Sequence, residues 1–391
     1  MKNSLLPTPT RARQCKQHSV TSLFDDARAD DARETEPRWT SIIMRAIDGD
    51  VRPPPRTRRE YLDAVVDAIA RNAQSVGDEP ASRANARVRR PVDVYAVSDV
   101  HTDVHANDEW MRSYVERAKR RNARDRRSVI VVAGDVATKL ETVKSTLRAL
   151  RGAFDEVHYL PAGNHELWCA ENEAWAMGTK YPNDSIGKLW RLIDACTECG
   201  ACCSPRRLSE TLVTTPIYGW YDDDFCEDAR RRGSYSALEA NFDAACKWPV
   251  WIRRDPDASA RDSHSDGIET FMRDVNRIAR DRFLATDATA ETTTAPRVVI
   301  TYSHFIPLPQ LYDRGNPALR HVMGSKRVDA DVRAWSASAS SASADASIHV
   351  FGHSHLNVDR VIRGVRYIQC ALGYPYERWF GANEPKLIHS A

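Results

Sequence analysis

The stretch VDVYAVSDVH, residues 92–101, carries an apolar run that ends in two polar side chains. Val92 to Ser98 has the length and the β-branched content of a buried strand. Asp99 and His101 come at its end, and alternate residues of an extended segment point to the same side. In an α/β sheet, ligands bind at the carboxyl ends of the strands. The stretch therefore predicts a strand followed by a loop in which an aspartate and a histidine face one ligand.

The same arrangement recurs further along the chain. In each case a short apolar run precedes polar residues of types that bind metal ions. An isolated histidine is more often a core or surface residue than a ligand, but several groups in order at strand ends indicate one shared site. The runs and groups are Val129–Ala133 with Gly134-Asp135, Val157–Leu160 with Gly163-Asn164-His165-Glu166, Val298–Tyr302 with Ser303-His304, and Ile348–Phe351 with Gly352-His353-Ser354-His355.

Amphipathic helices are expected between the apolar runs, which is the pattern of βαβ units. A strand is also expected from Leu212 to Trp220, and short strands around Val358 and Tyr367. This alternation predicts an α/β fold from about residue 91 to the end of the chain. The helices are expected at about residues 109–122, 137–154, 185–199 and 268–283.

Residues 1–90 are expected to form an N-terminal extension, with a helix from Arg59 to Asn72 that packs on the main domain. Met1 to Leu23 is basic, contains Ser and Thr, and has no acidic residue. This composition fits either a disordered tail or a transit segment for a chloroplast or mitochondrion. Two polar stretches, Arg253 to Gly267 and Trp335 to Ser347, are expected to be surface loops.

The composition narrows the possible functions. The chain has 391 residues, with 56 Lys+Arg against 54 Asp+Glu, and this balance argues against a nucleic-acid-binding protein. No apolar run approaches the roughly 20 residues that span a bilayer. The nine cysteines are an odd number, and no secretory leader is evident. We therefore expect reduced thiols in an intracellular, cytoplasmic protein.

The ligand types indicate the metal. Carboxylates and neutral imidazoles suit Mn, Fe or Zn better than Ca. Asp135 has two oxygens that could bridge two ions, and Asn164 offers a neutral amide oxygen. His353 and His355 alternate as Asp99 and His101 do, so each metal could receive one of them. Two ions about 3.5–4 Å apart would clamp a phosphoryl group and lower the pKa of a water molecule between them.

The ordered groups Asp-x-His, Gly-Asp, Gly-Asn-His-Glu, His and Gly-His-x-His resemble the calcineurin-like metallophosphoesterase superfamily, from about Val92 to Ile388. The resemblance is closer to a poorly characterised plant and protist branch of that superfamily. It implies a four-layer α/β/β/α sandwich of two mixed sheets flanked by helices, with the site at the strand ends. The segments that carry the closer resemblance are DVHTD at 99–103, GNHELW at 163–168, CKWP at 246–249 and GVRYIQ at 364–369.

The resemblance also implies roles for the individual residues. A bridging hydroxide would attack phosphorus, and His165 would protonate the leaving alkoxide as the general acid. Asp103 and Glu166 are either groups that orient the imidazoles or plain surface carboxylates. The first metal would be held by Asp99, His101, Asp135 and His355, and the second by Asp135, Asn164, His304 and His353.

The expected function is a dinuclear metal-dependent hydrolase of phosphate esters. Protein Ser/Thr phosphatases of this superfamily carry an arginine before Gly-Asn-His, where this chain has Pro161-Ala162. A nucleotide or cyclic-nucleotide phosphodiesterase is an alternative enzyme, and a non-catalytic scaffold that binds proteins is an alternative of another class. A scaffold, however, has no chemical need for His165.

Two other features carry less information. The cysteines from Cys196 to Cys203 are spaced too closely for a typical structural zinc site, and we interpret them as free thiols. The aromatic run from Tyr218 to Tyr221 fits either a pocket wall or the core.

Overall fold

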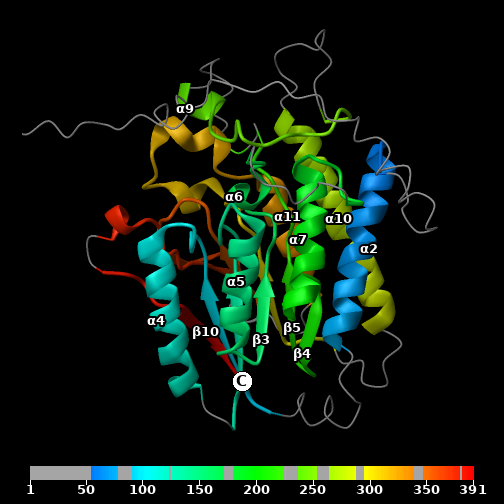
Figure 1. Ribbon diagram of the computed structural model, residues 1–391. Helices are drawn as coiled ribbons and strands as arrows, with labels where there is room; N and C mark the ends of the chain where they lie inside the picture. The colour runs from blue at the N-terminus through cyan, green and yellow to red at the C-terminus, as the bar shows by residue number, and fades with distance from the viewer. Residues whose placement is uncertain are drawn as a thin grey trace, which may run out of the picture. The chain divides into compact units, whose positions relative to one another are not determined.

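The computed structural model divides into two units, Met1–Val51 and Arg52–Ala391, and the described residues all lie in the second (Figure 1). The predicted tail or transit segment and most of the two predicted surface loops lie outside them. The described residues are 54–77, 90–122, 125–170, 179–222, 225, 237–252, 264–287, 295–338, 347–378 and 381–391.

The first sheet of the second unit is built around the stretch at residues 92–101. Strand β1 pairs in parallel with β2, and β2 pairs in parallel with β3. The fourth strand, β10, pairs antiparallel with β1, so the sheet is mixed. The order is β10-β1-β2-β3. The strands are β1 (Val92–Val97), β2 (Arg127–Val132), β3 (Glu156–Tyr159) and β10 (Lys386–Ser390).

The second sheet has the order β4-β5-β6-β7-β9-β8. Its four inner strands run parallel to one another, and both edge strands are antiparallel. Strands β5, β6 and β7 are almost entirely buried, as expected for parallel strands covered on both faces. The strands are β4 (Arg206–Ser209), β5 (Leu212–Pro216), β6 (Val298–Tyr302), β7 (Ser347–Phe351), β8 (Val358–Ile362) and β9 (Val365–Gln369).

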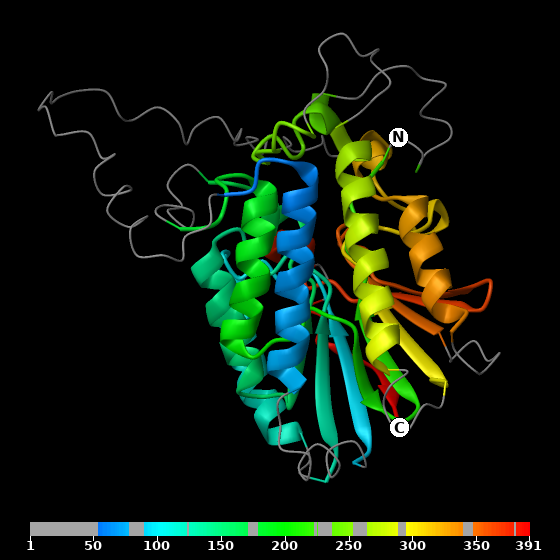
Figure 2. The same cartoon turned by 90° about the vertical axis from the view of Figure 1, so that its right-hand side faces the viewer.

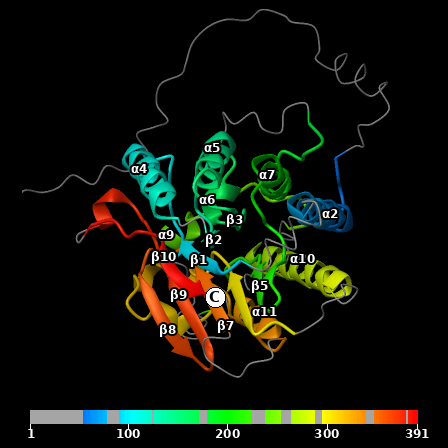
Figure 3. The same cartoon turned by 90° about the horizontal axis from the view of Figure 1, so that it is seen from below.

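Helices cover the outer faces of the two sheets, which gives the expected α/β/β/α layers. Figure 3 shows α4, α5, α7 and α2 in a row beside the first sheet, with α11 and α10 beside the second. Figure 2 shows α2 lying along α7, with α10 on its other side. The helices are α2 (Arg58–Gly77), α4 (His105–Arg121), α5 (Leu140–Arg151), α7 (Ser185–Cys199), α10 (His264–Asp287) and α11 (Lys326–Ser336).

The helix α7 ends where the sequence predicts, because both of its ends carry strong caps. The Asp184 carboxylate accepts a hydrogen bond from the Gly187 amide at 2.8 Å, and Gly200 adopts a left-handed φ of 67°. Helices without such caps differ from the prediction: α4 begins at His105, and α5 covers only Leu140–Arg151. The edge strands β4 and β10 and the helix α11 were not predicted.

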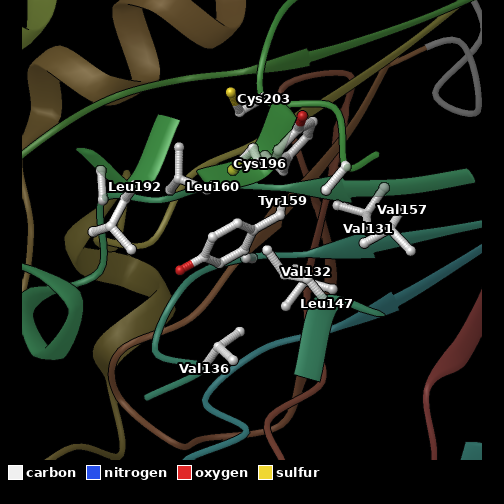
Figure 4. Packing of buried hydrophobic residues seen from close by; sticks show 14 of the residues in the cluster. Val131, Val132, Val136, Leu147, Val157, Tyr159, Leu160, Leu192, Cys196 and Cys203 are labelled. Atoms are coloured by element: carbon white, nitrogen blue, oxygen red, sulfur yellow. The ribbon is translucent and has the colours of Figure 1, made fainter. Parts of the chain in front are cut away.

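The core lies between the sheets and the helices. Figure 4 shows the Tyr159 ring of β3 among aliphatic side chains of β2 and α5. The thiols of Cys196 and Cys203 belong to the same hydrophobic cluster, and both are free and buried. These cysteines are free thiols, as predicted, and they act as small apolar core residues.

The helix α2 also contributes to this core, through the buried Tyr61, Val65 and Ile69. The predicted packing of this helix on the main domain is confirmed. The domain boundary near residue 90 stays a prediction. Among the described helices, none is both long enough and apolar enough to cross a membrane.

Candidate metal centre

The predicted ligand loops follow strands of both sheets and are joined by backbone hydrogen bonds. The Asp99 amide donates to the Gly134 carbonyl at 3.1 Å, which links the loops after β1 and β2. The Gly352 amide donates to the His304 carbonyl at 2.9 Å, which links the loops after β6 and β7. The His353 amide donates to Asp99 Oδ1 at 2.8 Å and so joins the two sheets. The structure therefore brings the predicted groups to one place.

The backbone of these loops is strained at the ligand positions. Among the described residues that are not glycine, six have a positive φ, and five of these are predicted ligands. Such conformations cost free energy and cluster at functional sites. The five are Asp99 (52°), His101 (46°), Asp135 (53°), His353 (75°) and His355 (55°).

Two glycines are required by the close approach of the loops. A Cβ on Gly134, whose φ is +80°, would lie 2.6 Å from His304 Nδ1. A Cβ on Gly163 would lie 2.1 Å from Glu166 Oε2 and 2.3 Å from Asp135 Oδ1. Any side chain at either position would push ligands apart, which explains why glycine precedes the ligand in both motifs.

The predicted metal ligands form two pockets. One pocket consists of the residues that were predicted to hold the second metal. His304 Nε2 lies 3.1 Å from Asn164 Oδ1, 3.2 Å from His353 Nδ1 and 3.3 Å from Asp135 Oδ2. Asn164 Oδ1 also lies 3.1 Å from His353 Nδ1. All four side chains are buried. We call this group of four the asparagine pocket.

The groups behind the asparagine pocket fix which atoms point into it. His304 Nδ1 donates to the Ala133 carbonyl at 3.0 Å, and His353 Nε2 donates to the Val322 carbonyl at 2.9 Å. Asn164 Nδ2 donates to Asp243 Oδ1 at 3.1 Å, so its Oδ1 faces the pocket. When His304 is neutral, the hydrogens of these three residues are used elsewhere and their lone pairs face one another. A proton on His304 Nε2 or a metal ion between the residues relieves this repulsion.

The other pocket consists of the residues that were predicted to hold the first metal. His101 Nε2 lies 3.1 Å from His355 Nε2 and 3.9 Å from Asp135 Oδ2. His355 Nε2 lies 3.6 Å from Asp99 Oδ1. We call this group of Asp99, His101, Asp135 and His355 the Asp99 pocket. Asp135 belongs to both pockets, as a bridging ligand must.

The spacing of the ligand atoms fits a metal ion most closely in the asparagine pocket. Two ligand atoms side by side on one ion, each bonded at about 2.1 Å, lie about 3 Å apart. The distances of 3.1–3.3 Å in the asparagine pocket match this value. The donor set of nitrogens, carboxylates and one amide oxygen suits Mn, Fe or Zn. The residues present therefore fit a metal centre.

The electrostatics of the asparagine pocket also favour a cation. Burial would lower the pKa of His304, but the Asp135 carboxylate overrides this effect and raises it to about 10. The pKa of His353 is lowered to about 3, by burial first and then by His304, so this ring is neutral. A metal ion and a proton compete for such lone pairs.

His165 lies beside the ligands, and its nitrogen is near enough to His101 and Asp135 for these three residues to form a possible metal-binding group. Its Nε2 is 4.0 Å from Asp135 Oδ2, and its ring packs on Trp168 with centroids 3.8 Å apart. The His165 side chain is 15% exposed, whereas that of His304 is 0% exposed. His165 therefore lies at the open side of the site.

The two carboxylates predicted as orienting groups differ in their positions. Glu166 is buried and accepts hydrogen bonds from the Asp135 and Val136 amides and from the Tyr159 hydroxyl. These hydrogen bonds hold the backbone at Asp135, and none of them involves an imidazole. Asp103 is exposed.

Three residues at the site were missed in the sequence. Asp243, from the long segment between β5 and β6, orients Asn164 and also accepts a hydrogen bond from Trp168 Nε1 at 2.8 Å. Glu377 Oε2 lies 2.7 Å from His355 Nδ1, and the Tyr374 ring stacks on His101. Tyr374 and Glu377 follow β9, so the same pattern of a strand followed by polar residues could have found them.

The remaining candidates lie in the core. Tyr218 and Trp220 are buried, which favours core packing for the aromatic run. His158 and His349, which were not predicted as ligands, are buried and hydrogen-bonded to threonine side chains, at 2.9 Å and 2.8 Å. Neither belongs to the metal centre.

No protein-family model matches the chain, and no curated protein matches its sequence. Among solved structures, it is similar to the crystal structure of phosphopantetheinyl hydrolase from Mycobacterium tuberculosis, with a TM-score of 0.47 and 21% identity. The match covers 74% of this chain and 92% of that chain. Any function must therefore be argued from the chain's own residues and contacts.

Proposed function

We propose that the chain is a metal-dependent hydrolase of phosphate esters with a dinuclear centre of the calcineurin-like kind. The observation that carries the proposal is the convergence of nitrogen and oxygen ligand atoms in the asparagine pocket, next to a second pocket that shares Asp135. Metal ions bound there would polarise the phosphoryl oxygens and lower the pKa of water.

The chain's own residues would then perform three tasks. Asp99, His101 and His355 would hold one ion, while Asn164, His304 and His353 would hold the other, with Asp135 between them. The buried hydrogen bonds behind these ligands would keep their orientations fixed, which lowers the reorganisation needed during the reaction.

His165 is the proposed general acid. Its Nε2 is not tied to a backbone carbonyl, and its ring is held in place by Trp168. In the reaction, water supplies the oxygen that forms the new bond to phosphorus, and the bond from phosphorus to the ester oxygen breaks. A proton passes from His165 to that leaving oxygen, so an alcohol is released.

The scaffold alternative is not favoured by these features. A strained backbone at five ligand positions costs stability, and so does a buried group of polar side chains with one carboxylate among them. A protein that only binds partners through its surface gains nothing from either feature.

The test is hydrolysis by the full chain loaded with Mn²⁺. It should release p-nitrophenol from p-nitrophenyl phosphate or from the bis(p-nitrophenyl) ester, and the ratio of the two rates gives the monoester or diester preference. Chelation and His304→Ala should each abolish the activity, while His105→Ala, at an exposed histidine of α4, should retain it. Bound metal without turnover of either ester would contradict the proposal and favour a scaffold.

A further inference from the structure

The segment from Gly373 to Arg378, which follows β9, crosses the open side of the metal centre. Its backbone is fastened to the loop that carries Asp99. The Leu372 amide donates to the Ser98 carbonyl, and the Gly373 amide donates to the Asp99 carbonyl, both at 3.0 Å. The left-handed φ of 67° at Gly373 turns the chain at this point. We call residues 373–378 the strap.

Side chains lock the strap in this position. Arg378 donates from Nε to the Leu372 carbonyl at 3.0 Å and from Nη2 to the Gly373 carbonyl at 2.8 Å. The buried Asn107 of α4 donates to the Gly373 carbonyl at 3.0 Å and accepts a hydrogen bond from Arg378. The strap is therefore part of the rigid frame of the site.

Glu377 connects the strap to a predicted metal ligand. Its Oε2 accepts a hydrogen bond from the Tyr374 amide at 2.8 Å and lies 2.7 Å from His355 Nδ1. One carboxylate oxygen thus sets both the tautomer of His355 and the backbone of Tyr374. The position of Tyr374 is coupled to the ligand geometry.

The Tyr374 side chain lies over the reacting region. Its ring stacks on His101, with centroids 4.5 Å apart and an interplanar angle of 18°. Its hydroxyl lies 3.5 Å from His165 Nε2. Tyr374 and His165 are both partly exposed, whereas His101 is buried. The hydroxyl and the imidazole nitrogen therefore face the same space at the open side of the site.

Two donors that lie 3.5 Å apart can both reach one oxygen at an ordinary hydrogen-bond distance of about 2.8 Å. We infer that the Tyr374 hydroxyl donates a hydrogen bond to the leaving ester oxygen, beside the proton supplied by His165. This inference rests on the proposed function. The hydroxyl keeps its own proton throughout, and its role is to stabilise the negative charge that develops on the oxygen as the phosphorus–oxygen bond breaks.

The alternative is that Tyr374 only packs against His101. The two roles differ in their dependence on the leaving group. The leaving oxygen carries more negative charge in phenolate than in p-nitrophenolate, because the nitro group draws charge away from the oxygen. A hydrogen bond to that oxygen therefore matters more for phenyl phosphate, while a packing role affects both esters equally.

The test is Tyr374→Phe in the full chain loaded with Mn²⁺, because this change removes the hydroxyl and keeps the stacked ring. We expect kcat on phenyl phosphate to fall roughly 30-fold, the effect of one hydrogen bond to a charged group. The fall on p-nitrophenyl phosphate should be several-fold smaller. In a His165→Ala background, the same substitution should cost less than it does alone, since both groups serve one oxygen.

Two controls separate this role from indirect effects. The Tyr376 ring stacks on Tyr374, and Tyr376 is 73% exposed. Tyr376→Phe removes its hydroxyl and should change kcat less than twofold. The Mn²⁺ content of Tyr374→Phe, measured by plasma mass spectrometry, should equal that of the parent.

Three results would overturn the inference. Equal losses of kcat on the two esters would leave Tyr374 as a packing residue only, and so would a lowered Mn²⁺ content that accounts for the whole loss. Absence of hydrolysis by the parent on both esters would overturn the proposed function and this inference with it. An active parent with equal losses would overturn the inference alone.

Discussion

Two buried clusters of charged and histidine side chains lie at opposite ends of the same strands. At the carboxyl ends of β2 and β3 is the metal centre, with Asp135 and Asn164. At their amino ends, Glu156 Oε1 lies 3.2 Å from Arg127 Nε, and its Oε2 lies 2.8 Å from Arg206 Nε. We call this second group, with His158 beside it, the glutamate cluster.

The difference between the clusters lies in their pairing. In the glutamate cluster, each charge meets an opposite charge, and His158 lies 3.3 Å from the Glu156 carboxylate and 2.9 Å from the Thr214 hydroxyl. In the asparagine pocket, the ligand atoms of His304, His353 and Asn164 face one another beside a single carboxylate, and the backbone is strained. A cluster of paired charges serves stability, whereas a cluster in which facing nitrogen and oxygen atoms must share one proton is suited to an added cation.

The largest expected effect comes from removing the bridging carboxylate. Asp135→Asn should lower phosphoesterase activity by about a thousandfold or more, since both pockets lose their shared charge. Asparagine tolerates the positive φ, and His304 can lose its proton once the carboxylate is gone. The unfolding free energy of the metal-free variant should therefore fall less than that of Glu156→Gln, whose arginines stay charged. Steady-state kinetics and urea denaturation with a chelator present measure the two quantities. An Asp135→Asn variant that loses stability but keeps its activity would show that the metal centre serves stability, which would contradict this comparison.

The matched change in the glutamate cluster should have the opposite outcome. Glu156→Gln removes the buried carboxylate charge that both Arg127 and Arg206 face, which should cost about 3–5 kcal/mol of unfolding free energy. The activity per folded molecule should not change. Urea denaturation gives the unfolding free energy, and kcat at a temperature where the variant is folded gives the activity per folded molecule. A variant as stable as its parent would show that the pairing in this cluster contributes little.

A smaller effect is expected from Asp243, which orients one metal ligand. Asp243→Asn lets the new amide donate, so Asn164 can turn its own amide nitrogen toward the pocket. The affinity for Mn²⁺ should fall about 10–100-fold, as for other groups that orient metal ligands. Calorimetric titration measures it. Trp168→Phe removes the other hydrogen bond to the same oxygen and serves as the control, with a smaller fall expected. An unchanged affinity in Asp243→Asn would mean that Asn164 is oriented by other contacts.

The smallest expected effect is on the pH dependence of the unfolding free energy. Burial would raise the pKa of Glu156, but His158 and Arg206 lower it well below the ordinary value of about 4.3. The stability that this shift contributes is present above the unfolded-state pKa and is lost as the pH falls below it. The difference in unfolding free energy between the parent and Glu156→Gln should therefore be largest near pH 6 and should shrink below about pH 4. Denaturation curves at several pH values measure it, and a constant difference would contradict this account.

The sequence predicts the ligand loops well, because strand ends in an α/β sheet converge whatever lies between them. The runs before Asp99, Asp135 and His304 are apolar and short, and each forms the expected strand. The strong caps of α7 likewise fix its bounds. The edge strands β4 and β10 were missed because each is short and few of its residues are buried.

The residues that orient the ligands could not be predicted, because they come from parts of the chain without a repeating pattern. Asp243 lies in a turn 79 residues after Asn164, and only the tertiary structure brings the two together. Glu166 stands in a predicted motif, but its partners are the backbone amides of another loop, and sequence spacing cannot indicate this. The choice of ligands follows from local patterns, and their orientation follows from long-range packing.

The metal content of the purified chain tests the central claim most directly. After loading with Mn²⁺ and removal of the excess, plasma mass spectrometry should find about two ions per chain, as a dinuclear site requires. His304→Ala should retain fewer, and Glu156→Gln should retain the parental number. A parent that binds no Mn²⁺, Fe or Zn would contradict the claim that the facing nitrogen and oxygen atoms form a metal centre.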